Sequence, residues 1–119
     1  MGNPVVRWQI VSADPDSTAS FYRDLFGWTD TRDNALGYRQ VNTGSNGIDG
    51  GVWPGPPQVQ PFVQLFIEVP DVGRHIAHAI ELGAQVIVPD SVLPEGDRMA
   101  VLRDPSGLPF AICSSVRTS

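Results

Sequence analysis

The sequence predicts an α+β fold built from two modules, each in the order strand-helix-strand-strand-strand (βαβββ). The first observation behind this is an internal repeat, because Ile10 matches Ile67 and Asp14 matches Asp71, both 57 residues apart. The second is that an alternating apolar stretch in each half leads into a helix-like segment that ends at a glycine. Repetition on this scale indicates two copies of one supersecondary unit.

The first predicted strand covers about residues 4–11, and its period of two puts Arg7 and Gln9 on one face. Asp14 is then suited to cap a helix, since its carboxylate accepts hydrogen bonds from the first free N–H groups. Pro15 fits the first helical position, where no N–H group is needed. We therefore expect a helix that packs on one face of the strand.

Three shorter strands complete the first module, which spans about residues 4–53. They are expected near Trp28, at 38–41 and at 48–53. The last of them is rich in glycine, which indicates a bulge or a close approach to the backbone and leaves its register open. The proline-rich segment 54–61 reads as a linker, because proline blocks strand pairing.

The second module spans about residues 62–115 and repeats this order. Its first strand, 62–69, alternates between an apolar face and a mixed face that carries Gln64, Phe66 and Glu68. Asp71 is the expected helix cap. Further strands are predicted near 85–88, 99–103 and 109–113, with a turn at 104–107.

A helix covers only one face of each predicted sheet, so the other face needs a different cover. That face carries Arg7, Gln9, Gln64, Phe66 and Glu68. Two halves that curl together would form a cup-shaped mixed sheet lined by these residues. A short open sheet commonly pairs with a second chain, so a homodimer is expected.

The composition narrows the classes of partner. The 119 residues suffice for one domain, or for two half-domains with one core. A net charge of −5 argues against nucleic acid, whose phosphates require a basic face. No apolar run approaches the roughly 18 residues of a membrane span, and no secretory signal is visible. The single cysteine excludes an internal disulfide, so a cytoplasmic location is expected.

Three segments resemble the vicinal oxygen chelate superfamily, which includes glyoxalase I, extradiol dioxygenases, fosfomycin resistance enzymes and bleomycin resistance proteins. They are residues 14–28 with the run Phe21-Tyr22-Arg23-Asp24-Leu25-Phe26-Gly27, then Leu82-Gly83-Ala84, and then Arg103-Asp104-Pro105-Ser106-Gly107. The resemblance covers nearly the whole chain. It implies paired βαβββ modules of the glyoxalase/bleomycin-resistance type, in a dimer whose clefts hold a small ligand.

The resemblance also implies where a metal ion would bind in metal-dependent members. Each module there offers one ligand from its first strand, usually histidine or glutamine, and a glutamate from its last strand. The matching positions here are Arg7 and Gln64, then Ala111 and a residue within 49–51. Arginine repels a cation and alanine has no donor atom. We therefore expect neither a metal site nor a cofactor.

Several polar residues are candidates for ligand binding, each with a structural alternative. Arg7 could anchor an anionic or carbonyl group by bidentate hydrogen bonds, or could form an internal ion pair with Glu68. Glu68 could act as a general acid or base, or could lie at an exposed strand end. Gln9 and Gln64 could orient a ligand, or could bridge neighbouring strands.

Two further candidates are aromatic and one is cationic. Trp53 and Phe66 could form a platform for a flat ligand, although core or dimer packing is the alternative. Arg98 could lie at the mouth of the site, or could form a salt bridge with Asp97 or Glu95.

The leading hypothesis for function is the metal-independent binding or sequestration of a small organic, partly aromatic ligand. The alternative is a metal-independent isomerase, cyclase or lyase, in which Arg7 polarises a carbonyl and Glu68 moves a proton. A metal-dependent glyoxalase or dioxygenase is the third hypothesis, and the donor positions above argue against it.

Overall fold

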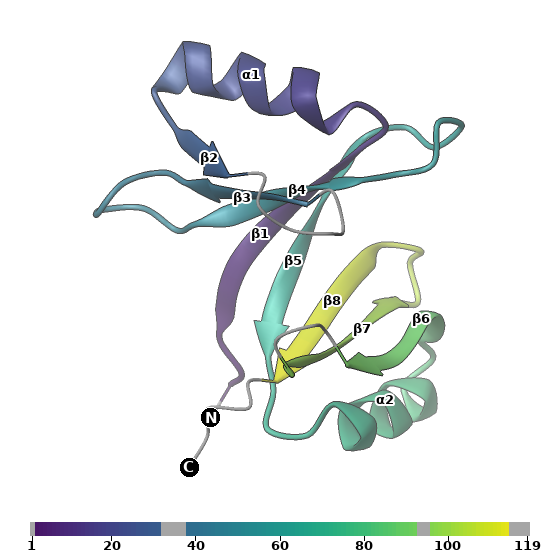
Figure 1. Cartoon of the computed structure of the whole chain (residues 1–119). Coiled ribbons are helices and arrows are strands. Elements are labelled where there is room, and N and C mark those ends of the chain that lie inside the picture. Colours follow the sequence, from purple (N-terminus) through teal and green to yellow (C-terminus); the bar gives the residue numbers. More distant parts are fainter. Residues whose placement is uncertain (1, 32–37, 93–95, 115–119) are drawn as a thin grey trace. The chain divides into compact units, whose positions relative to one another are not determined.

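A computed structural model describes residues 2–31, 38–92 and 96–114, and it confirms the α+β class (Figure 1). The chain divides into two compact units. The N-terminal unit comprises residues 7–64, and the C-terminal unit comprises residues 1–6 together with 65–119. Within the described ranges, no helix is long and apolar enough to cross a membrane.

The N-terminal unit has its strands in the order β2-β3-β4-β1, and β1 pairs with β4 in parallel. The pairs β2–β3 and β3–β4 are antiparallel. The first two residues of β1 belong to the C-terminal unit. The elements are β1 (Val5–Ser12), α1 (Pro15–Phe26), β2 (Thr29–Thr31), β3 (Arg39–Asn42) and β4 (Gly50–Pro54).

Helix α1 begins and ends as its sequence predicts. The Asp14 carboxylate accepts a hydrogen bond from the Ser17 N–H at 3.1 Å, and Pro15 occupies the first turn. The helix ends at Gly27, whose φ of 77° lies in the left-handed region that favours glycine. Ala19 is the buried residue of the helix. Together with Ile10 and Val52 of the sheet, it lines a small hollow between the helix and the sheet.

The C-terminal unit has the strand order β5-β8-β7-β6, with β5 and β8 parallel. Asp71 caps its helix, because its carboxylate accepts from the Arg74 N–H at 3.1 Å. Strand β6 is longer than predicted and passes Pro89 at a register shift, where an edge strand tolerates proline. The elements are β5 (Phe62–Glu68), α2 (Val72–Glu81), β6 (Gln85–Val92), β7 (Arg98–Arg103) and β8 (Pro109–Ser114).

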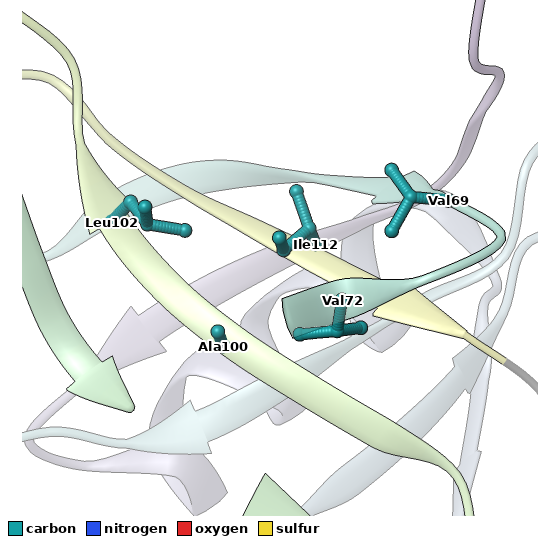
Figure 2. Close-up of a cluster of buried hydrophobic side chains, with 5 residues drawn as sticks. All are labelled: Val69, Val72, Ala100, Leu102 and Ile112. Carbon is teal, nitrogen blue, oxygen red and sulfur yellow. The ribbon is translucent and has the colours of Figure 1, made fainter. Parts of the chain in front are cut away.

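An apolar core lies between α2 and the sheet of this unit (Figure 2). It consists of Val69, Val72, Ala100, Leu102 and Ile112. Leu102 has an exposed fraction of 0% and Val72 of 2%, so each contributes about 1.5–3 kcal/mol by burial. This core holds β7 and β8 against the helix.

The side chains of β5 alternate between two faces as predicted, but only the second half of its apolar face packs against other residues. Ile67 packs against the core, whereas Val63 and Leu65 are exposed. On the mixed face, Gln64 and Phe66 are buried. The strand therefore buries its polar glutamine and exposes two aliphatic residues, the reverse of what hydropathy alone predicts.

A buried ion-pair network connects α1 to the sheet of the N-terminal unit. The Arg39 guanidinium lies 3.3 Å from the Asp30 carboxylate and also pairs with Asp16 on α1. Arg23 on α1 approaches Asp30 at 3.3 Å. The Arg39 and Asp30 side chains are only 7% and 8% exposed, so each charge depends on its partner for stabilisation.

Replacement of this buried cation is expected to destabilise the fold. Arg39→Met leaves Asp30 with one cation, so we expect the free energy of unfolding to fall by about 2–3 kcal/mol. Urea unfolding followed by circular dichroism measures the change. Arg74→Met, at an exposed position of α2, is the matched control and should stay within about 0.5 kcal/mol of the wild type. Equal losses in the two variants would contradict the importance of the network.

The turn between β7 and β8 predicts a pH dependence. The Asp104 carboxylate accepts from the Ser106 hydroxyl at 2.6 Å and from the Leu108 N–H at 3.0 Å, and these bonds lower the pKa of Asp104. Because the folded pKa lies below the unfolded one, the stabilisation is complete above about pH 4 and disappears as the pH falls through the folded pKa. The stability difference between wild type and Asp104→Ala, measured by urea unfolding, should therefore narrow as the solution is acidified. A constant difference would contradict this.

Candidate functional site

Two buried glutamines form the centre of the candidate site in the N-terminal unit. Gln9 on β1 and Gln64 at the start of β5 have exposed fractions of 2% and 5%. The Nε2 group of Gln64 donates to Oε1 of Gln9 at 2.7 Å. Among the described residues, Oε1 of Gln64 has no hydrogen-bond partner. A buried acceptor without a donor costs about 1–3 kcal/mol, so this oxygen is suited to a ligand N–H or O–H group.

The register of β4 places a glycine beside this pair. Gln9 aligns with Gly51 across the parallel β1–β4 ladder, and Gln40 aligns with Gly51 from the other side. Gly51 is buried, and a Cβ atom there would overlap the hydroxyl and ring of Tyr38. The Tyr38 ring also contacts the Trp53 ring, with centroids 5.1 Å apart. These aromatic rings therefore lie on the sheet face that carries Gln9.

Arg7 is half-buried and precedes Gln9 by two residues on β1, which puts both on one face of the strand. Four predicted site residues thus belong to this unit, namely Arg7, Gln9, Trp53 and Gln64. Tyr38 and Gly51 are new members. The only sequence signal for them was the glycine-rich strand, which indicated a close approach to the backbone without naming the approaching group.

The predicted site residues of the C-terminal unit lie in different surroundings. Phe66 is 2% exposed and packs with Met99, Ala111 and Cys113 on the sheet face opposite the α2 core. Glu68 is half-buried, and its N–H donates to the Pro4 carbonyl at 2.9 Å. The phenylalanine therefore lies within an apolar cluster.

Arg98 lies on the other face of β7, away from the Phe66 cluster. Its guanidinium donates to both carboxylate oxygens of Asp90, at 3.0 and 2.8 Å. These hydrogen bonds and the attraction of the carboxylate raise the pKa of Arg98. Arg98 thus forms a salt bridge, as the structural alternative predicted, but its partner is Asp90. Of the two partners expected from the sequence, Glu95 lies outside the described residues.

Of the four positions at which the resemblance implies metal ligands, only Gln64 carries a side chain suited to bind a divalent cation. Gln9 and Phe66 are equivalent in the internal repeat. Gln9 aligns with Gly51, and Phe66 aligns with Ala111. Gly51 is therefore the residue within 49–51 that corresponds to Ala111. Neither glycine nor alanine offers a side-chain donor. Asp49 instead accepts from the Thr43 N–H at 3.0 Å. No group of three or more histidine, cysteine, aspartate or glutamate side chains suited to a metal occurs in the described ranges.

Comparison with solved structures shows that the fold recurs in other proteins. A variant of the Streptomyces coelicolor methylmalonyl-CoA epimerase, in complex with 2-nitronate-propionyl-CoA, is 20% identical with a TM-score of 0.63, over 96% of this chain and 98% of that one. The hypothetical protein BH1468 from Bacillus halodurans C-125 is 14% identical with a TM-score of 0.69, over 100% and 99% of the two chains. At these identities the likeness concerns the fold alone.

Sequence comparison identifies closer relatives and the family. Proteins named "Putative glyoxylase CFP32" from Mycobacterium bovis and Mycobacterium tuberculosis are 30% identical over 107 residues, which is 87% of this chain. The chain spans about two fifths (41%) of the length of these curated relatives. The model of the glyoxalase-like domain matches residues 8–113. Because this match covers most of the sequence, the chain belongs to the glyoxalase-like domain family.

Proposed function

We propose that this glyoxalase-like domain binds a small, partly aromatic organic molecule without a resident metal ion. The observation that supports the proposal most directly is the buried Gln9–Gln64 pair, in which one amide oxygen has no donor within the part of the chain that the structure describes. Glycine and alanine at the two last-strand positions support the metal-free part. The homodimer, the cytoplasmic location and the catalytic alternative through Arg7 and Glu68 stay predictions.

The glutamine pair selects a ligand by hydrogen-bond complementarity. Oε1 of Gln64 accepts only, so a molecule that offers an N–H or O–H group forms a bond that an acceptor-only molecule cannot form. Trp53 and its neighbouring aromatic ring favour a flat apolar part. A neutral aromatic compound with a primary amide combines both properties, and benzamide is the smallest convenient example.

The proposal predicts a preference between two closely matched compounds. Benzamide offers an N–H donor, whereas N,N-dimethylbenzamide keeps the ring and the carbonyl but has no donor. We expect benzamide to bind more tightly by about tenfold, the equivalent of one hydrogen bond of about 1.4 kcal/mol. Ligand-observed NMR titration measures both affinities.

The same titration tests whether binding is independent of a metal ion. EDTA treatment, or addition of zinc, nickel or manganese, is expected to leave the benzamide affinity unchanged. Binding that requires a divalent cation would contradict metal independence. Equal affinity for the two compounds would contradict the role of Gln64.

The glutamine pair also predicts an asymmetry in stability. In Gln9→Leu, the buried amide nitrogen of Gln64 loses the acceptor to which it donates. We therefore expect the free energy of unfolding to fall by about 1–3 kcal/mol. Replacement of both glutamines by leucine removes the polar groups together and should recover most of that loss. Urea unfolding of the wild type, the single variant and the double variant tests this. A double variant less stable than Gln9→Leu would contradict the assignment of the pair.

A further inference from the structure

The loop between β3 and β4 presents an exposed asparagine directly before an exposed glycine. Asn46 and Gly47 lie at the tip of this loop, which spans residues 43–49. The Gly47 N–H group donates to the Gly44 carbonyl at 3.2 Å and closes a turn over residues 44–47. Because glycine has no side chain, the backbone at Gly47 reaches conformations that other residues exclude. Its backbone nitrogen can therefore approach the side-chain amide of Asn46.

This neighbourhood supports an intramolecular reaction in which the asparagine loses its amide group. The Gly47 backbone nitrogen attacks Cγ of Asn46, so that a C–N bond forms and Nδ2 leaves as ammonia with the proton of the Gly47 N–H group. Water then opens the resulting imide ring at one of its two carbonyl carbons. Opening at Cγ gives aspartate, whereas opening at the main-chain carbonyl gives isoaspartate, in which the backbone runs through Cβ and Cγ. Either product adds a negative charge to the loop, and asparagine is accordingly among the thermolabile residues.

The fold restrains this reaction at Asn46 only weakly. The hydrogen bond of the Gly47 N–H group must open before the nitrogen can attack. Opening one exposed hydrogen bond lowers the reactive population by about tenfold at most, the equivalent of about 1.4 kcal/mol. Among the residues that the structure describes, the Asn46 amide has no hydrogen-bond partner to break.

The other asparagines are in different positions. Asn42 precedes Thr43, and the fold holds both reacting groups: the Asn42 amide oxygen accepts from the Gly44 N–H group at 3.0 Å, and the Thr43 N–H group donates to the Asp49 carboxylate at 3.0 Å. The branched side chain of threonine adds a steric obstacle. Asn3 precedes a proline, which has no N–H group to attack with. The fourth asparagine, Asn34, lies outside the described residues.

Asp49 precedes Gly50 and could form the same imide with loss of water, but the sheet restrains it. Its carboxylate accepts from the Thr43 N–H group at 3.0 Å. Gly50 is buried in β4, aligned with Trp8 on one side and with Val41 on the other, and the Trp8 ring lies over it. Movement of this backbone requires the sheet to open, which costs more than one exposed hydrogen bond at a loop tip.

We propose that Asn46 is a modification site, at which the folded protein converts asparagine to aspartate and isoaspartate by reaction with water alone. The base of the loop is held by Thr43, whose hydroxyl donates to the Ile48 carbonyl at 3.2 Å. The extra backbone atom of isoaspartate is therefore confined to the tip. The modification changes the charge of the loop and leaves the register of β3 and β4 intact.

The test incubates the full chain in mildly alkaline buffer, once folded and once in concentrated guanidinium chloride. Peptide mass spectrometry, with chromatographic separation of the aspartyl and isoaspartyl forms, follows each site. We expect the folded protein to convert Asn46 at a rate within about tenfold of the rate in denaturant. Asn42 and Asp49 are expected to change in denaturant and to stay intact in the folded protein over the same period.

Asn46→Gln is the matched control, because it keeps the amide but would have to form a larger ring. Loss of the amide at position 46 is expected to fall to background in this variant. After incubation, wild type and Asn46→Gln should unfold at the same urea concentration, since the change is confined to the loop tip. An Asn46 that stays intact in the folded protein while it is converted in denaturant would overturn the proposal. Folded-state conversion of Asp49 as fast as that of Asn46 would contradict the protection by the sheet.

Discussion

The parallel pairing of β1 with β4 is the constraint on which the candidate site depends. Its register sets Gln9 beside Gly51, and the corresponding pairing of β5 with β8 sets Phe66 beside Ala111. Side chains in register on adjacent strands project from the same face. A shift of β1 by one residue would turn Gln9 toward α1 and would put Trp8 or Ile10 on the face that Gln9 now occupies. The polar character of the candidate site therefore depends on the register of β1 and β4 as well as on the residues themselves.

The register is protected from both sides of the sheet in the N-terminal unit. On the α1 side, the network of Arg39, Asp30 and Asp16 ties the helix to β2 and β3. On the other face, the hydrogen bond between Gln9 and Gln64 would be lost if β1 shifted by one residue. Buried polar groups discriminate between alternative pairings, because an unmatched buried amide costs about 1–3 kcal/mol and an unmatched charge costs more, out of a total stability of roughly 5–15 kcal/mol.

Much of the fold could be predicted from the sequence, because its signals are local. Capping aspartates, the glycine after α1 and the alternation in β1 and β5 each depend on a few neighbouring residues, and all appear in the structure. The continuation of β6 through Pro89 was missed, since an edge strand relaxes the usual exclusion of proline. The burial of Arg39 was also missed, because it depends on two aspartates that pattern alone does not bring together.

The candidate site was less predictable, because its geometry depends on contacts between strands. Alternation indicated that Gln9 and Gln64 share a type of face, but their direct hydrogen bond required the relative register of two strands far apart in the sequence. Tyr38 reaches Gly51 along a diagonal that no periodicity describes. Arg98 was assigned by its place before a strand, whereas its partner Asp90 lies on the opposite strand of a hairpin.

The mutual dependence of Gly51 and Tyr38 constrains how such a domain can evolve. A larger side chain at position 51 could not be accommodated while the tyrosine ring stays in place. Loss of the tyrosine alone would leave a gap beside Trp53. Neither single step is neutral, so a change at either position requires two coupled substitutions. Lineages of this kind are therefore expected to retain the glycine and the tyrosine together or to lose them together.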